Sequence, residues 1–467
     1  MTSPRGTHRM TALELYIPPK PRSLWSVAAL VRALWRGDGN LLELLPAAAY
    51  RFQVGNLGYS RRSTILFNDP DCVREILRDD GAVFPKSDLM VNALEPLIGQ
   101  SIFVTDGARW ARQRAMIDPA FSRMRLHHAF SAMAETVDDH ESILRQRAER
   151  GETFSLDLAM SHLTADIICR TVFSTPLVSD VAREVFDDFT LFERSVAQVD
   201  ILHLITKPAW AEMPQSDHVL AACTRIRQHL GALIDTHSAP SGQFDDIASA
   251  VMSAVDGDLG KPFSRDELID QLGVFFLAGH ETTASALTWV FYILAARPEW
   301  MAFLREEIDQ ELQGAAMTFD MSKRLPRLRA FFRETLRLYP PITFLPRVAQ
   351  QATRIGGRKI RRGALVMISP WTLHRHETWW RNPHAFDPMR FMPGGEGDTN
   401  SGAYIPFGQG PHICVGAGFA QTEALLIMAH LIRTFDWHLT PGQTVRPAAR
   451  LTTRPASQVS VHLSLRQ

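Results

Sequence analysis

Cysteine is scarce in this chain of 467 residues, which contains four cysteines and no CxxC pair. Without that spacing, the sequence does not indicate a zinc ribbon. Four cysteines that lie far apart do not indicate a disulfide framework either. We therefore expect a reducing, cytoplasmic compartment.

Excess charge of either sign is also missing, since 50 lysines and arginines balance 50 aspartates and glutamates. Proteins that bind nucleic acid normally carry a basic excess, so no nucleic-acid partner is expected. The first ten residues, MTSPRGTHRM, lack the apolar core of a signal peptide. Residues 27–45 are partly apolar, but charged residues interrupt them. Residues 1–50 are therefore predicted to be an N-terminal segment that leads into the rest of the domain and has no transmembrane anchor.

No internal repeat or low-complexity block is present, and the hydrophobic pattern is mostly helical. Apolar residues at helical spacing dominate residues 126–173, 181–196 and 219–234. Short β-like runs occur at residues 63–67, 364–368 and 458–463, and turn-forming residues cluster at 340–346 and 386–397. Residues 238–242 read as a surface loop, not as a domain boundary. The pattern predicts a mainly α fold with small sheets, formed by residues 1–467 as a single domain.

A long apolar segment has a polar centre. Ser264 and Glu267 match a capping box, which predicts a helix that runs to about residue 296, before Pro298. The helix is long enough to span a membrane, but the sequence HETT, residues 280–283, lies near its middle. Charged groups at that depth in lipid are costly. We therefore expect a helix buried within a globular protein, and no integral membrane span.

The polar centre of this helix allows two interpretations. Ala278 and Thr282 share one face, and Gly279 removes a side chain so that another group can approach the backbone. A local widening of the helix would free a carbonyl to bond to Thr282 or to water. Alternatively, Thr282 and Thr283 donate hydrogen bonds back to carbonyls within the helix.

A second helix is predicted at residues 328–341, LRAFFRETLRLYPP, where two prolines end it. Glu334 and Arg337 are three residues apart and can pair on one face. Their apolar neighbours indicate that the pair is buried, and a buried pair requires further hydrogen bonds. Arg390, in the sequence FDPMRF, is a candidate third member of this cluster.

The stretch FGQGPHICVG surrounds Cys414 with glycines and places it before a helical pattern. Gly408, Gly410 and Gly416 allow tight turns with unhindered N–H groups near the sulfur, and Phe407 can shield it from water. A helix N-terminus favours a thiolate, the form of cysteine that binds metals. The alternative is a buried, inert cysteine. The loop does not match GxGxxG, and neither His-Glu pair in the chain continues as HExxH, so a dinucleotide site and a zinc peptidase lose support.

Taken together, these motifs resemble those of the cytochromes P450, which are haem-thiolate monooxygenases. The family motifs correspond to Trp110 and Arg114 (WxxxR), Ala278 to Thr282 (small-Gly-x-acid-Thr), Glu334 and Arg337 (ExxR), Arg390 and Phe391, and Phe407, Gly410, Cys414 and Gly416 (FxxGxxxCxG). Two positions depart from the family pattern, because His412 stands where arginine is common and Met389 stands where an acid is common.

The resemblance implies a mainly α, prism-shaped cytochrome P450 fold with a small β-rich region and a buried haem b, iron protoporphyrin IX. Cys414 would be the axial ligand of the iron, and Thr282 would hold dioxygen and a water while Glu281 relays protons. Glu334, Arg337 and Arg390 would be structural. The remaining residues expected to contact the cofactor are Trp110, Arg114, Ala278, Arg347, Phe407, Gly408, His412 and Gly416, of which Trp110, Arg114, Arg347 and His412 would bind the propionates. For Arg347 the alternative is an ordinary surface arginine.

The implied reaction inserts one atom of O2 into a C–H bond of a hydrophobic small molecule, such as a fatty acid, a terpenoid or a similar lipid. The expected substrate contacts, for which core packing is the alternative, are Met90, Ile102, Phe103, Phe275, Ala278, Ile342, Phe344 and Leu451. Electrons would come from a separate ferredoxin or flavodoxin/reductase, which Arg109 and Arg112 would help to dock unless they are simply solvated. The alternatives are a haem-thiolate enzyme that uses peroxide or catalyses isomerisation or dehydration, and a non-catalytic haem-binding sensor.

Overall fold

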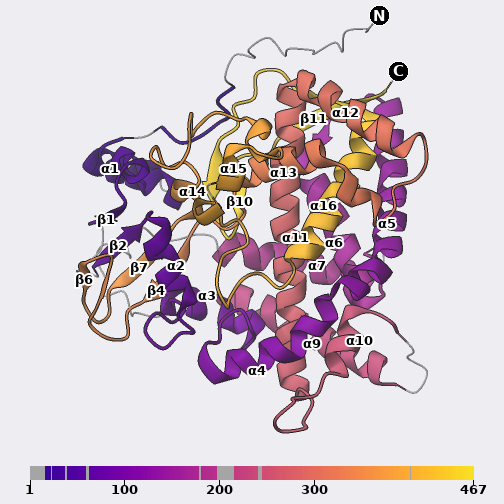
Figure 1. Ribbon diagram of the computed structural model, residues 1–467. Coiled ribbons are helices and arrows are strands. Elements are labelled where there is room, and N and C mark those ends of the chain that lie inside the picture. The colour runs from indigo at the N-terminus through magenta and orange to yellow at the C-terminus, as the bar shows by residue number, and fades with distance from the viewer. Residues whose placement is uncertain are drawn as a thin grey trace, which may run out of the picture.

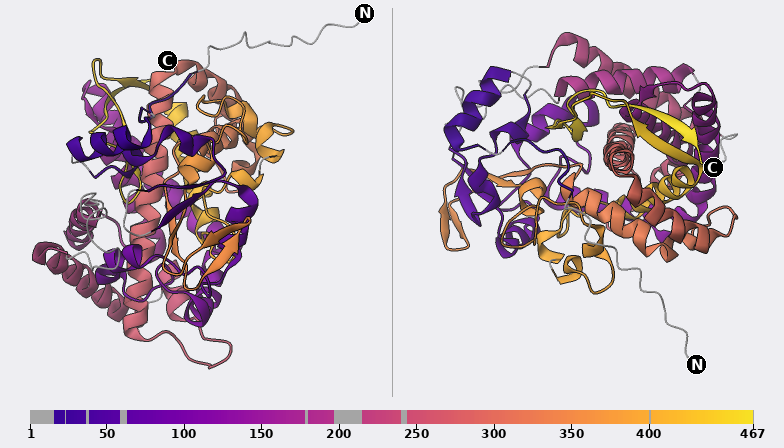
Figure 2. Two further views of the ribbon diagram at one scale, coloured as in Figure 1. Left: turned by 90° about the vertical axis from the view of Figure 1, so that its left-hand side faces the viewer. Right: turned by 90° about the horizontal axis from the view of Figure 1, so that it is seen from above.

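The computed structural model describes residues 16–22, 24–36, 39–58, 63–177, 180–196, 215–239, 244–399 and 401–466. Figure 1 shows a body of packed helices beside a smaller region that contains the four-stranded sheet. α11 (Arg265–Ala296) passes through the middle of the helical body, and Figure 2 shows it end-on with other elements around it. The mainly α fold with small sheets is therefore confirmed.

The helices agree well with the hydrophobic pattern. In chain order they are α1 (Ser26–Arg36), α2 (Pro70–Arg78), α3 (Asp88–Ile98), α4 (Gly107–Ile117), α5 (Arg123–Glu149), α6 (Leu156–Phe173), α7 (Asp180–Val196), α9 (Asp217–Ser238), α10 (Ile247–Met252), α11, α12 (Pro298–Leu312), α13 (Pro326–Leu338), α14 (Pro370–Leu373), α15 (Glu396–Thr399) and α16 (Ala417–Thr434). Short 3-10 helices include η1 (Leu41–Leu44) and η5 (Pro388–Phe391). The apolar stretch 126–173 holds two helices, because the chain turns at Gly151 with φ of 61°. Residues 240–242 of the expected surface loop lie outside the described residues.

The strands form four small sheets. The largest has the order β1 (Val54–Asn56), β2 (Thr64–Phe67), β7 (Leu365–Ile368) and β4 (Leu345–Val348). β2 and β7 are parallel, with Ile65 opposite Val366, and the other pairs are antiparallel. A three-stranded sheet has the order β3 (Phe154–Ser155), β11 (Ser460–Leu465) and β8 (Phe435–Leu439). Two further sheets have two strands each: β5 (Thr353–Ile355) pairs with β6 (Arg358–Ile360), and β9 (Pro447–Ala449) pairs with β10 (Thr453–Pro455).

A capping box fixes the N-terminus of α11, and the burial of its side chains stabilises the rest of the helix. The Ser264 hydroxyl accepts a hydrogen bond from the Glu267 N–H, and the Glu267 carboxylate accepts one from the Ser264 N–H, so the predicted capping box is confirmed. Most of its side chains between Leu268 and Leu294 are buried. The group that approaches the backbone at Gly279 is Ile168 of α6, since a Cβ there would lie 2.5 Å from Ile168 Cδ1. Among the described helices, none is both long and apolar enough to cross a bilayer.

The Glu334–Arg337 pair is fully buried, and its hydrogen bonds are satisfied as a buried pair requires. Arg337 donates to both carboxylate oxygens of Glu334 at 2.7 and 2.8 Å. It also donates to the carbonyls of His374, Pro383 and Ala385. The network ties α13 to the loop that precedes η5.

Arg390 joins this cluster from η5. Its Nε lies 3.5 Å from Glu334 Oε1, as the sequence predicts for a third member. Its closest carboxylate, however, is Glu396 of α15, six residues further along the chain. Glu396 therefore supplies the negative charge that the sequence lacks at Met389.

Candidate active site

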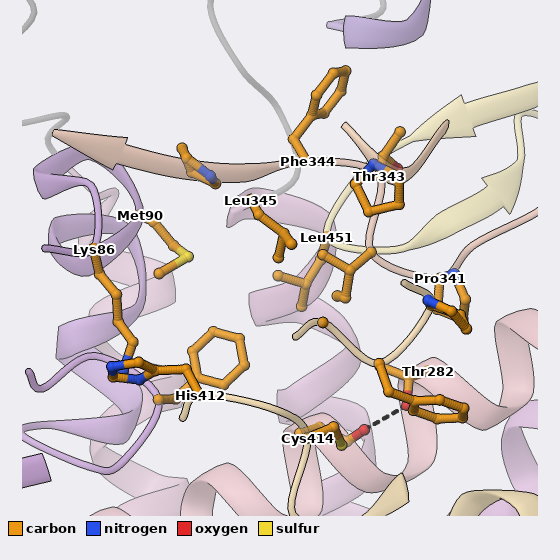
Figure 3. A pocket seen from close by; sticks show the side chains of 18 of the residues that line it. Lys86, Met90, Thr282, Pro341, Thr343, Phe344, Leu345, His412, Cys414 and Leu451 are labelled. Atoms are coloured by element: carbon orange, nitrogen blue, oxygen red, sulfur yellow. Dashed lines mark hydrogen bonds between the residues drawn. The ribbon is translucent and has the colours of Figure 1, made fainter. Parts of the chain in front are cut away.

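A cavity of about 600 Å³ lies between α11, β4 and the loop before α16. Figure 3 shows Cys414 and Thr282 at one end of it, Lys86 and His412 together on one side, and apolar side chains such as Leu451 across from Cys414. Every residue predicted to contact the cofactor or the substrate lines this cavity: Met90, Ile102, Phe103, Trp110, Arg114, Phe275, Ala278, Ile342, Phe344, Arg347, Phe407, Gly408, His412, Cys414, Gly416 and Leu451.

The loop before α16 presents the Cys414 sulfur to the cavity. Gly408 and Gly410 have φ of 77° and 76°, which favours glycine. A Cβ at Gly410 would lie 2.2 Å from the Leu77 carbonyl oxygen, so glycine is required for the loop to pack there. The Cys414 N–H donates to the Phe407 carbonyl at 2.9 Å, which closes the turn.

The surroundings of the Cys414 thiol suit a metal ligand. Cys414 is exposed, whereas Cys72, Cys169 and Cys223 are buried, so the alternative of a buried, inert cysteine does not describe Cys414. Its exposed surface faces the enclosed cavity, so desolvation still holds the pKa of the Cys414 thiol above its ordinary value, although the Gly416 N–H and the charge of Arg114 act to lower it. Because the net shift is upward, the thiolate that binds a metal would depend on the positive charge of a bound cation as well as on these two groups.

Thr282 faces the cavity from α11. Its hydroxyl donates to the Ala278 carbonyl at 2.7 Å. α11 continues as an unbroken α-helix through this point, so the bond is the ordinary one between residues four apart. Thr288, further along the same helix, makes the same bond to Ala284. The Thr282 oxygen keeps its acceptor capacity for a molecule in the cavity.

The Glu281 carboxylate does not line the cavity. It is buried in an ion pair with Arg454 of β10 and accepts a hydrogen bond from the Thr452 hydroxyl at 2.6 Å. Burial acts to raise the pKa of Glu281, but the charge and hydrogen bonds of Arg454 outweigh it and lower the pKa below its ordinary value. The structure thus places Thr282 and Cys414 in one cavity and turns Glu281 toward β10.

Four basic side chains gather on one side of the cavity. Arg347 is buried there, so it is not a surface arginine, and Arg114 donates to the Ile413 carbonyl at 2.6 Å. Lys86, which no motif indicated, donates to the carbonyls of Ile102 and Thr105. Burial lowers the pKa of Lys86 to about 7, and Arg347 contributes to the decrease.

His412 completes this basic group. It packs against Trp110 with ring centroids 4.0 Å apart, and its Nε2 lies 3.7 Å from Asp106 Oδ1. Burial and the nearby cations lower its pKa to about 3, so the imidazole is neutral. Its Nδ1 is buried and finds no hydrogen-bond partner within the part of the chain that the structure describes.

These features fit a haem. Cys414 would bind the iron of the haem, and the haem would carry two propionates. The basic side of the cavity offers these carboxylates Arg114, Arg347, Lys86 and the unpartnered His412 nitrogen. The glycines beside the sulfur leave room for the ring, since a Cβ at Gly416 would contact only Cys414 Sγ, at 4.0 Å. Fold and site together define a haem-thiolate protein.

Two further residues escaped the sequence analysis. Arg454 lies 173 positions from its partner Glu281, and no local pattern links them. Glu423 of α16 is fully buried, and neither of its carboxylate oxygens finds a hydrogen-bond partner in the described chain. An acid within the apolar sequence AQTEALLIMA was a signal that could have indicated it.

The expected docking role of Arg112 is not supported. Its guanidinium pairs with Asp256 at 2.8 Å and with Glu267 at 2.7 Å. Because two carboxylates neutralise it, Arg112 ties α4 to the start of α11 and offers little charge to an acidic carrier.

Comparison with known proteins agrees with this site. The sequence model of the family described as "Cytochrome P450" matches residues 18–462. The chain is 31% identical over 423 residues to "Cyclooctat-9-en-7-ol 5-monooxygenase" of Streptomyces melanosporofaciens, covering 88% of each chain. It is 28% identical over 407 residues to "Cytokinin hydroxylase" of Arabidopsis thaliana, covering 85% of this chain and 78% of that one. The crystal structure of the cytochrome P450DA heme domain has a TM-score of 0.77 at 24% identity over 89% of each chain, which shows a shared fold.

The chain therefore belongs to the cytochrome P450 family, and it is a cytochrome P450 monooxygenase with a haem-thiolate cofactor. Such an enzyme uses O2, an organic substrate and a redox partner.

Proposed function

We propose that the cofactor is haem b and that the enzyme hydroxylates a hydrophobic small molecule. The observation that carries the proposal is one cavity with a cysteine sulfur and a threonine hydroxyl at one end, basic groups at one side and apolar side chains elsewhere. Thiolate-bound haem supplies electron density that favours O–O cleavage. Cys414 is the proposed ligand, and the Gly416 N–H stabilises its charge.

The propionates are proposed to bind the basic side of the cavity. Arg114 and Arg347 would donate charge-assisted hydrogen bonds, and Trp110 would donate its neutral indole N–H. Neutral His412 would donate one hydrogen bond from a ring nitrogen. Lys86 is added to this group on the strength of its position in the cavity wall.

Thr282 and Glu281 are proposed to deliver protons. The Thr282 oxygen can accept a hydrogen bond from a water in the cavity while its O–H donates to the Ala278 carbonyl, and it can donate to dioxygen only when that O–H turns away from the carbonyl. Glu281 can pass a proton toward that position only when its carboxylate leaves Arg454 and turns to the cavity. Proton delivery therefore depends on a side-chain movement.

The substrate is proposed to be a fatty acid, a terpenoid or a similar lipid. Apolar residues such as Met90, Phe103, Phe344 and Leu451 form much of the wall, and a cavity of this size can enclose a small organic molecule. The relatives named for cyclooctat-9-en-7-ol and for cytokinin support small-molecule hydroxylation without pointing to one compound. We further propose a single-domain protein in the cytoplasm that receives electrons from a ferredoxin or a flavodoxin/reductase.

The test is the carbon monoxide difference spectrum of the dithionite-reduced protein. The wild type should show the strongly red-shifted Soret band of thiolate-bound haem, and Cys414→Ser should lose it. Cys223→Ser is the matched control, since Cys223 is a buried cysteine outside the cavity wall. A Cys414→Ser protein that keeps the band would refute the ligand assignment.

A second test concerns the reaction. Fatty acids and terpenoids that enter the cavity should shift the spin state of the haem, and the bound compound should be hydroxylated with NAD(P)H and a redox partner. Thr282→Ala should keep haem yet release reducing equivalents as peroxide, and full coupling in this variant would contradict the role of Thr282. Product formed only with added peroxide would favour the peroxide-using alternative.

A further inference from the structure

α1 turns its small side chains inward and its large apolar side chains outward. Ala29 and Ala33 are fully buried against the protein, whereas Val27, Val31 and Trp35 lie on the opposite face and are exposed. Their spacing of four residues places them in one stripe along the helix, to which Leu34 also belongs. Trp35 is 84% exposed. A surface helix normally shows the reverse arrangement.

Further exposed apolar side chains lie just before the outward stripe in the sequence. Fifteen large hydrophobic side chains are exposed in the described chain, and six of them fall within residues 17–35: Ile17, Trp25, Val27, Val31, Leu34 and Trp35. The other nine are spread over residues 124–465. Scattered exposed apolar residues are normal, but a cluster of this kind marks an interaction site.

This surface is also basic, although the chain as a whole is neutral. Residues 16–36 contain Lys20, Arg22, Arg32 and Arg36 and no acidic residue, although the Arg32 side chain is largely buried and burial lowers the pKa of Lys20 to about 8. The buried carboxylate of Glu43 pairs with both Arg32 and Arg36, so it neutralises one positive charge of two. An exposed apolar stripe with basic flanks is complementary to an anionic lipid surface.

We propose that residues 17–36 form an in-plane anchor that docks the protein on an anionic lipid bilayer. α1 has 11 residues and a length of about 16 Å, too short to span a bilayer core of about 30 Å, so it must lie in the interface. Tryptophan is the side chain most suited to that depth, since its ring is apolar and its N–H is polar. Figure 1 places α1 at the outer edge of the molecule, beside the four-stranded sheet, where a flat surface can reach it.

The anchor adjoins the cavity. α1 packs against η1, and Leu41 and Leu44 of η1 line the cavity wall. A lipid-dissolved substrate would therefore meet the protein beside this wall. That consequence rests on the proposed function, whereas the docking itself does not.

Flotation of the holoenzyme with vesicles tests the proposal. The wild type should float with vesicles that contain about 30% phosphatidylglycerol in phosphatidylcholine and much less with phosphatidylcholine alone. The double variant Trp25→Ser/Trp35→Ser should bind at least about tenfold more weakly, because it removes the two aromatic anchors. The matched control is Met124→Ser/Leu259→Ser, which alters two similarly exposed apolar side chains far along the chain from α1.

Three results would overturn the proposal. The wild type could fail to bind the anionic vesicles, or the tryptophan variant could bind as well as the control. A dimer in lipid-free solution that only the tryptophan variant dissociates would assign the surface to a second copy of the chain. The carbon monoxide spectrum of each variant, recorded in parallel, separates a failed anchor from a failed haem site, since no anchor residue contacts the cavity.

Discussion

Glu423 should make the stability of the folded protein depend on pH. Its side chain is fully buried in α16, and the Thr283 hydroxyl is the polar group that acts on it. Burial raises the pKa of Glu423 from 4.5 to about 8, although the Thr283 hydroxyl acts in the opposite direction. The folded protein therefore holds this carboxyl in its neutral form at pH 7.

The pH dependence of the free energy of unfolding follows from the linkage between folding and protonation of Glu423. The folded state binds the Glu423 proton more tightly than the unfolded state does, so this group's contribution to stability is fully present below pH 4.5 and is lost as the pH rises to about 8. A difference of about 3.5 in pKa corresponds to about 5 kcal/mol at 1.36 kcal/mol per unit. Glu423→Gln cannot ionise and escapes this loss. With about 2.1 cal/mol/K of unfolding entropy per residue, 1 kcal/mol shifts the Tm of this chain by about 1 °C.

The measurement is the Tm of the holoenzyme at pH 5 and at pH 8. Glu423→Gln should unfold about 3–5 °C above the wild type at pH 8 and within about 1 °C of it at pH 5. Asp309→Asn is a control of opposite sign, because a hydrogen bond from Arg466 lowers the pKa of Asp309. That carboxylate stabilises the fold above its unfolded pKa, so its removal should lower the Tm at pH 8. If the Tm difference between Glu423→Gln and the wild type were the same at pH 5 and at pH 8, the reasoning would be refuted.

Three further substitutions test packing, the buried network and proton delivery. Gly279→Ala should cost about 1–3 kcal/mol of stability through its clash with Ile168, and adding Ile168→Val, which removes Cδ1 but keeps a γ carbon 3.0 Å away, should recover part of the Tm; no recovery would assign the loss to another cause. Arg337→Lys keeps the charge but loses the fork of hydrogen bonds, so haem content after mild heating should fall below that of the wild type, and equal retention would contradict a structural role. Arg454→Gln should raise the pKa of Glu281, because it removes the largest effects that oppose burial and leaves only those of His280 and Thr452, and it should move the pH profile of coupling upward; an unchanged profile would argue against Glu281 as the proton donor.

The sequence predicts best what depends on neighbours in the chain. The capping box of α11, the end of α13 before two prolines and the glycine-rich loop at Cys414 are local patterns, and the structure forms each where expected. The Glu334–Arg337 pair also needs only one helix face. Burial was correctly inferred there from the apolar flanks.

Local sequence patterns do not reveal contacts between segments that lie far apart in the chain. Glu281 was predicted to relay protons because it lies in the family motif of the long helix, but its partner Arg454 comes from β10 near the end of the chain. Arg112 was expected to help dock an acidic redox partner, with a solvated arginine as the alternative, but it pairs with two carboxylates that lie more than a hundred residues away along the chain. For both Glu281 and Arg112 the sequence indicated a functional charge, but the partner of that charge depends on the fold.

The basic side of the cavity shows the same rule at the level of the whole site. Lys86, Arg114, Arg347 and His412 come from four separate stretches; the family resemblance indicated the last three, whereas no pattern in the sequence indicated Lys86. The fold gathers them, so burial lowers the pKa of both Lys86 and Arg347, and Lys86 is lowered further by the charge of Arg347. A group with two carboxylates relieves both the desolvation and the repulsion by pairing with these cations. Because it binds only the folded chain, the cofactor must stabilise the fold as well as supply the chemistry.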